Sequence, residues 1–137
     1  RGRPQPYEGA SWGASLAAKL LQERARGEES IFHAYLQTLP ESISTPVHAS
    51  PLELEEVQYR SMISRIEDLS SRFQHDYDQS PPFALEGATW QQFVNTLATV
   101  YSRTFRLNGR RYLIPGIDWL NHSVGTYQAE WRIDEAV

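Results

Sequence analysis

Apolar residues recur every three or four positions along most of the chain, which is the spacing of amphipathic helices. Ser11 is suited to cap the first such segment, and Gly27 is expected to end it. A shorter helix is expected to begin at Ser30 and to stop at Pro40. Residues 40–50 hold two prolines and four Ser or Thr, so they are predicted to form a loop.

Two capping boxes predict the helices that follow this loop. Ser50 and Glu53 form the first box, and one long helix is predicted over 51–79. The apolar positions that define its buried face are Val57, Met62, Ile63, Ile66, Leu69, Phe73 and Tyr77. Thr89 and Gln92 form the second box. The apolar positions of its helix are Phe93, Val94, Leu97, Val100 and Tyr101.

The hydrophobic pattern changes after the last helix. Asn108-Gly109 is the most favoured two-residue turn between strands, and it predicts a hairpin. Residues 112–114 are expected to form a short, buried, apolar strand that Pro115 ends. Residues 127–133 alternate between apolar and polar side chains, which predicts a half-buried strand. The expected fold class is therefore α+β, mainly helical with a small β region, whose remaining sheet partners we expect outside this chain.

Composition narrows the classes of function. The 137 residues fit one domain, and 40% hydrophobic residues favour folding over disorder. A net charge of −4 argues against a nucleic-acid partner, because phosphate contacts need concentrated Lys and Arg. No apolar run approaches the roughly 18 residues that a membrane span needs. The absence of Cys excludes disulfides and thiolate chemistry. Without a secretory signal we expect an intracellular protein, and cytoplasm, nucleus and plastid remain open.

Polar side chains concentrate between residues 101 and 123. Arg103 ends the last helix, and Asp118 begins an Asp-x-x-Asn-His-Ser stretch. An Arg fork suits a ligand carboxylate, but a cation at a helix C-terminus is an equally good structural explanation. Asp, Asn and Ser are also common in simple polar turns. Asn121-His122-Ser123 matches the N-glycosylation pattern, which we discount because no secretory signal accompanies it.

A metal site is one alternative. His33, His75-Asp76 and Asp118 follow the order of ligands in metal-dependent phosphohydrolases of the HD type. Such a site needs these side chains presented together from several helices. His75 and Asp76 fall at the end of the long predicted helix, so the order is easily a coincidence.

The run from 93 to 123 resembles the SET-domain protein methyltransferases, in the branch typified by the Rubisco large-subunit lysine methyltransferase. The matching segments are Ser102-Arg103-Thr104-Phe105, Tyr112-Leu113-Ile114-Pro115 and Asp118-Trp119-Leu120-Asn121-His122. Residues 12–42 also resemble the Leu-rich helix of this branch and its Tyr-Leu-x-x-Leu-Pro segment. The resemblance therefore covers most of residues 12–123.

The resemblance implies a domain organisation. Residues 1–137 would be an internal piece of a SET domain. Its N-terminal segment would be 1–50, and 51–102 would be the helical insertion that this branch places inside the domain. Residues 103–137 would contribute core strands and the Asn-His motif.

The resemblance also implies a reaction and its residues. The methyl group of S-adenosyl-L-methionine would pass to a lysine side chain of a protein substrate, or to a histidine. Asn121 and His122 would hold the cofactor's adenine, largely through backbone groups. Arg103 would face both cofactor and substrate channel, and Asp118 would lie near the target-lysine channel. The reaction aligns two reactants and sheds a lysine proton, so it needs no metal.

Three departures from the family pattern matter. The Gly-x-Gly strand and the Tyr-Gly region with the catalytic tyrosine are not among these residues, and Leu107 stands where a second Arg is common. We therefore assign no catalytic residue, and Tyr101, Tyr112 and Tyr127 are not taken as substitutes. The isolated chain is expected to transfer little or no methyl. A non-catalytic helical interaction module is the second alternative, and the oligomeric state is left open.

Overall fold

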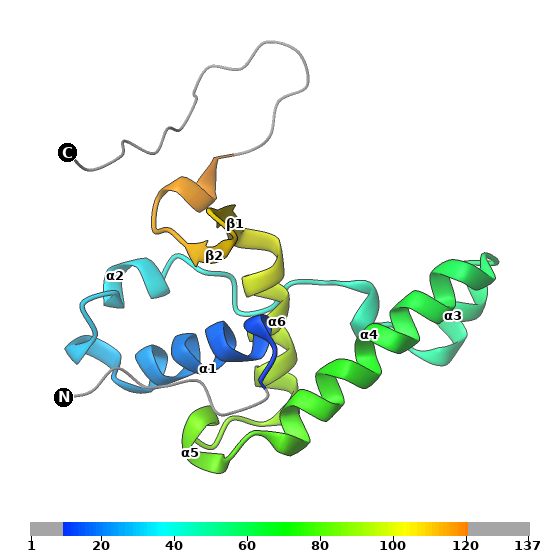
Figure 1. The fold of residues 1–137 in the computed structure, drawn as a ribbon, viewed down its shortest axis with the longest axis horizontal. Helices are drawn as coiled ribbons and strands as arrows, with labels where there is room; N and C mark the ends of the chain where they lie inside the picture. Colours follow the sequence, from blue (N-terminus) through cyan, green and yellow to red (C-terminus); the bar gives the residue numbers. More distant parts are fainter. Residues whose placement is uncertain (1–9, 121–137) are drawn as a thin grey trace, which may run out of the picture.

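A computed structural model describes residues 10–120, apart from the side chains of Pro82 and Phe83. This part of the chain is mainly helical, with one two-stranded antiparallel sheet, which confirms the expected α+β class. The elements are α1 (Trp12–Ala25), η1 (Gly27–Glu29), α2 (His33–Leu36), η2 (Pro46–His48), α3 (Pro51–Glu56), α4 (Arg60–Gln79), α5 (Pro82–Leu85), α6 (Trp90–Arg103), β1 (Thr104–Leu107), β2 (Arg110–Leu113) and η3 (Ile117–Trp119). Figure 1 shows their arrangement.

The core lies where α1 packs against α6 (Figure 1). Ser11 caps α1 as predicted, because its hydroxyl oxygen accepts a hydrogen bond from the Ala14 amide at 3.1 Å. Small side chains let the two helices approach closely: the buried residues of α1 are Gly13, Ala14, Ala17, Ala18, Leu20 and Leu21. On α6, Phe93, Leu97 and Val100 have no exposed surface.

Three other elements close this core. Phe73 from the C-terminal half of α4 is buried, as are Ala84 and Leu85 of α5. Leu36 of α2 and Leu39 just after it cover a further side. The core is therefore assembled from segments spread over about 90 residues of sequence, which no local pattern specifies.

The long helix predicted over 51–79 is interrupted. The capping box of Ser50 and Glu53 is present, but α3 ends at Glu56 and α4 begins at Arg60. Gln58 between them takes a left-handed conformation with φ of 52°, which no helix continues through. Nothing in α3 is buried, so packing does not hold the two helices in line. In Figure 1, α3 and the first half of α4 form an arm that stands away from α1 and α6.

The helix expected from Ser30 to Pro40 is shorter than predicted. Only His33–Leu36 is α-helical. Ser30 has an extended backbone, and its hydroxyl oxygen accepts a hydrogen bond from the Phe32 amide at 3.1 Å. This local turn replaces the first helical turn, as is common for Ser.

The hairpin forms as the Asn-Gly pair predicted. Leu107 pairs with Arg110 across the turn, and Asn108 and Gly109 both have positive φ, 47° and 77°. The expectation of a buried strand at 112–114 is wrong for the described residues, because Tyr112 is 41% exposed and β2 ends one residue before Ile114. In the described range the sheet consists of these two strands, and no third strand pairs with either of them. The strand predicted over 127–133 lies outside that range.

No helix in residues 10–120 is both long enough and apolar enough to cross a membrane.

Candidate functional site

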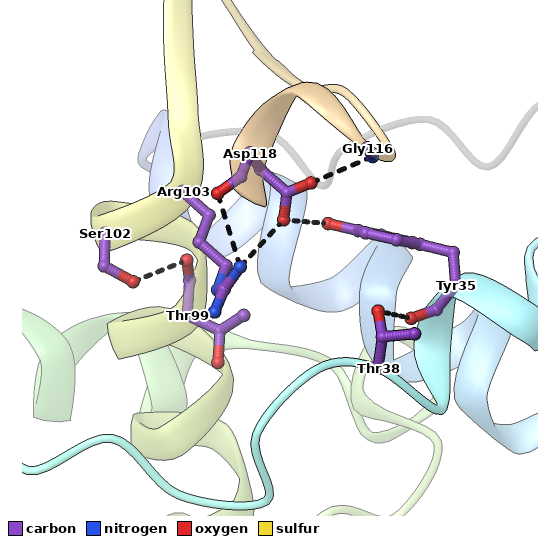
Figure 2. A network of polar contacts seen from close by, with 7 residues as sticks. All are labelled: Tyr35, Thr38, Thr99, Ser102, Arg103, Gly116 and Asp118. Atoms are coloured by element: carbon purple, nitrogen blue, oxygen red, sulfur yellow. Dashed lines mark hydrogen bonds and ion pairs between the residues drawn. The ribbon is translucent and has the colours of Figure 1, made fainter. Parts of the chain in front are cut away.

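The carboxylate of Asp118 is the centre of a polar network (Figure 2). Its Oδ2 atom accepts hydrogen bonds from the Tyr35 hydroxyl at 2.9 Å and from Arg103 Nη1 at 3.1 Å. Its Oδ1 atom accepts one from the Gly116 amide at 3.1 Å. The Asp118 side chain has no exposed surface, so these three donors replace the water that a free carboxylate would bind.

The local sequence folds Asp118 into this position. Gly116 has a φ of 85°, which favours glycine, and it turns the chain directly after Pro115. The short η3 follows, and its Asp118 amide donates to the Ile114 carbonyl at 3.3 Å. The carboxylate then accepts from the amide two residues back, as Asx side chains commonly do in turns. This turn holds Asp118 over the end of α6.

Arg103 comes to the site because α6 ends there. It is the last residue of the helix, and the hairpin starts at the next position. Its Nη1 atom also lies 3.4 Å from the Asp118 carbonyl oxygen, so both backbone and side chain of Asp118 hold the guanidinium group. The side chain of Arg103 is 25% exposed, which makes this a partly buried ion pair rather than a surface one.

Tyr35 reaches the site from the other end of the chain, 83 residues before Asp118. It stands on α2, and its carbonyl oxygen accepts a hydrogen bond from the Thr38 hydroxyl at 2.7 Å (Figure 2). Burial raises the pKa of the Tyr35 phenol well above its ordinary value. The hydrogen bond to Asp118 and its negative charge raise the pKa further, while the charge of Arg103 opposes them. The hydroxyl therefore stays protonated and acts as a donor.

Two of the four residues assigned to binding from the sequence meet here, Arg103 and Asp118. Asn121 and His122 follow Asp118 by three and four positions in the sequence and lie outside the described residues. The Asp118 carboxylate is enclosed by its donors, so the role toward a lysine channel stays a prediction. Tyr35 is a site residue that pattern analysis missed. Its segment was part of the family resemblance, but no spacing along the sequence relates it to Asp118.

A cavity of about 340 Å³ opens beside the network, between α1, α2 and β2. Most of its lining is apolar, and the residues include Leu16, Leu20, Phe32, Tyr35, Tyr112 and Pro115. Tyr35 thus lines the cavity and also belongs to the polar network through its hydroxyl.

The ligands of the phosphohydrolase alternative do not converge. His75 is exposed on α4, whereas Asp76 beside it is buried and accepts a hydrogen bond from the Ser11 hydroxyl at 2.6 Å. Asp118 is engaged by Arg103 and Tyr35. Among the described residues no three His, Asp or Glu side chains are grouped so that they could hold a metal ion. The alternative therefore gains no geometric support.

Comparison of the chain with protein-family models, with curated proteins and with solved structures gives no match. Two observations bear on function: the order of the motifs along the sequence, and the contacts around Asp118. Both lead to a proposal.

Proposed function

We propose that this chain is part of a SET-domain protein-lysine methyltransferase that uses S-adenosyl-L-methionine. One observation carries the proposal. Two regions that resemble the family, residues 12–42 and 93–123, are far apart in the sequence, and both contribute to the network: Tyr35 comes from the first region, and Arg103 and Asp118 come from the second. The hairpin alone brings Arg103 close to Asp118, but Tyr35 lies 83 residues before Asp118, and its contact with the same carboxylate supports one shared site.

The proposed site continues from Asp118 into Asn121 and His122, which would hold the adenine of the cofactor. Arg103 would face the cofactor and the substrate channel, and Asp118 would lie close to the target lysine. The helices α3 to α5 and nearly all of α6 fall within 51–102, the proposed insertion of the SET domain. The protein partner would be the substrate whose lysine is methylated.

The chemistry that such a site performs is an in-line displacement. Bound S-adenosyl-L-methionine would supply the methyl group to the neutral lysine amine, and the electron pair of the carbon–sulfur bond would stay with the sulfur. The amine then releases one proton. Alignment of the two reactants supplies much of the rate enhancement in such a reaction. The isolated 137-residue chain would transfer little or no methyl, because it lacks the family's Gly-x-Gly and Tyr-Gly motifs.

The first test is a titration of the isotopically labelled chain with S-adenosylhomocysteine, followed by NMR. We expect weak binding, in about the millimolar range or near −4 kcal/mol, because these residues form only one wall of the proposed pocket. The signals of Arg103, Asp118, Asn121 and His122 should shift together. Asn121→Ala should weaken the binding by about tenfold, or roughly 1.4 kcal/mol.

Gln79→Ala is the matched control, since it removes an exposed amide side chain at the far end of α4. It should leave the binding unchanged. The proposal is contradicted if S-adenosylhomocysteine shifts no signals, or if the shifts survive Asn121→Ala at unaltered affinity. Tight binding together with methyl transfer by this chain alone would contradict the proposed inactivity of the isolated chain.

A second candidate function is a non-catalytic helical interaction module. The exposed apolar side chains on the arm favour it: Leu52 is 75% exposed, Tyr59 61% and Met62 49%. A contiguous exposed apolar patch commonly marks a protein contact, and this candidate function expects these side chains to form one. This candidate gives a different result for Asn121→Ala, which would alter stability and no property that depends on S-adenosylmethionine.

A further inference from the structure

The hydroxyl group of Tyr35 has a single hydrogen-bond partner in the part of the chain that the structure describes. That partner is Asp118 Oδ2, at 2.9 Å (Figure 2). The aromatic ring packs against the core, and a Phe ring would make the same contact. The hydroxyl is therefore dispensable for packing, and it orients the Asp118 carboxylate together with the Gly116 amide, which donates to Oδ1.

That carboxylate in turn orients Arg103. A guanidinium group is planar, and Nη1 of Arg103 contacts two oxygen atoms of Asp118. Two contacts to one residue restrict rotation of the plane. Within residues 10–120, Nε and Nη2 of Arg103 make no hydrogen bond, and the side chain is 25% exposed. These two nitrogens form the edge that binds a carboxylate through two parallel hydrogen bonds.

We propose that Tyr35 is a positioning residue. It holds the Asp118 carboxylate, which fixes the guanidinium plane of Arg103 so that the Nε–Nη2 edge is presented to the carboxylate of a ligand. Only the identity of that ligand, the amino-acid portion of the cofactor, rests on the proposed function. The alignment of Arg103 by Tyr35 is a property of the chain itself and can be measured without any ligand.

The test compares Tyr35→Phe with Tyr77→Phe. Both substitutions remove one tyrosine hydroxyl that donates a hydrogen bond, since the Tyr77 hydroxyl donates to the Ala88 carbonyl at 3.2 Å. In the wild-type chain, NMR should show separate Nη signals for Arg103, because rotation of its guanidinium group is restricted. Tyr35→Phe should average these signals. Tyr77→Phe should lower the unfolding midpoint but leave the Arg103 signals separate.

Binding gives a second comparison, with two ligands that differ in the amino-acid portion. S-adenosylhomocysteine should bind Tyr35→Phe about five to ten times more weakly than wild type, because the Arg103 edge is no longer held in place. 5′-Methylthioadenosine has the same adenosine but no carboxylate, so it should bind both chains equally. A purely structural role for Tyr35 would weaken both ligands alike.

The outcomes separate this inference from the proposed function. If S-adenosylhomocysteine fails to bind the wild-type chain, the proposed function fails, and the Arg103 signals still decide the role of Tyr35. Arg103 signals that remain separate in Tyr35→Phe, or that average in both variants, overturn the inference. Should Tyr35→Phe fail to fold, the wild-type chain decides. Its Tyr35 hydroxyl proton should exchange slowly and show a cross-peak to the Arg103 Nη1 proton, and absence of that cross-peak overturns the inference.

Discussion

The Asp118 carboxylate is out of contact with water, and three hydrogen-bond donors around it offset the free energy lost with its hydration. Its side chain has no exposed surface, yet both oxygen atoms accept hydrogen bonds. Removal of one member of a fully buried ion pair commonly costs about 3–5 kcal/mol, and the cost should be smaller here because Arg103 is 25% exposed. Arg103 and Asp118 are therefore coupled, so a substitution of either residue also changes the electrostatic energy of the one that remains.

The pH dependence of stability should report Tyr35. Its folded-state pKa is raised, first by burial and then by Asp118, whereas the unfolded residue titrates near 10. The protonated hydroxyl's contribution is thus complete below about pH 10 and is lost as the pH rises beyond it. Thermal unfolding above pH 10 should show a steeper decline for wild type than for Tyr35→Phe. Parallel declines in the two chains would contradict this account. The pKa of Tyr101 is also raised, mainly by burial, but Tyr101 is present in both chains and so contributes equally to both declines.

At the scale of elements, two helices begin with the same device and meet different surroundings. Ser50 and Thr89 each head a complete capping box. The helix after Thr89 buries Phe93, Leu97 and Val100 in the core, while the helix after Ser50 buries nothing. A cap stabilises the whole fold only when the helix that it begins packs against the core.

The two caps should therefore respond differently to the same substitution. Thr89→Ala should lower the free energy of global unfolding by about 1 kcal/mol. Ser50→Ala should change it by less than about 0.5 kcal/mol, because α3 can fray without opening the core. Chemical denaturation measures both values, and equal losses would mean that α3 unfolds together with the core.

Local signals account for much of what the sequence predicts about the elements. Caps at Ser11, Ser50 and Thr89 and the Asn108-Gly109 turn each involve neighbours within four residues, and all are present. The residues between α3 and α4 include no Gly or Pro, so the usual sequence signal for a helix break is missing. One signal was present: Val57 and Met62 lie five positions apart, which interrupts the spacing of a continuous helix.

The site was less predictable than the elements. Arg103 and Asp118 stand out in the sequence because they flank a hairpin within 15 residues. Tyr35 joins them only through the way α2 packs beside α1 and the hairpin, which brings residues 83 positions apart into contact. No periodicity encodes such a contact. The roles of Asn121 and His122 stay predictions, since these residues lie beyond the described range.

For the whole molecule, the approach of α1 to α6 sets the geometry on which the site depends. Arg103 ends α6, and the hairpin that follows lies beside the start of α1, where the Arg111 guanidinium stacks over the Trp12 ring at 4.6 Å. Tyr101 fills the junction, with its ring 4.6 Å from Trp12 and 5.4 Å from Phe73. One aromatic ring thus links α1, α4 and α6, two residues before Arg103 in the sequence.

Gly13 is the position at which this junction can be tested. A Cβ atom at Gly13 would lie 2.7 Å from Tyr101 Cε2, so the ring would have to move. Moving it disturbs contacts with Trp12 and Phe73, each worth about 0.5–1.5 kcal/mol. Alanine is favoured over glycine in a helix interior by about 1 kcal/mol, but Gly13 lies in the first turn, where that gain is smaller. Gly13→Ala should therefore destabilise the fold by about 1 kcal/mol in chemical denaturation.

In a Tyr101→Ala background the obstructing ring is absent, so the same substitution should be neutral or stabilising. Equal effects in the two backgrounds would mean that the ring does not set the distance between α1 and α6.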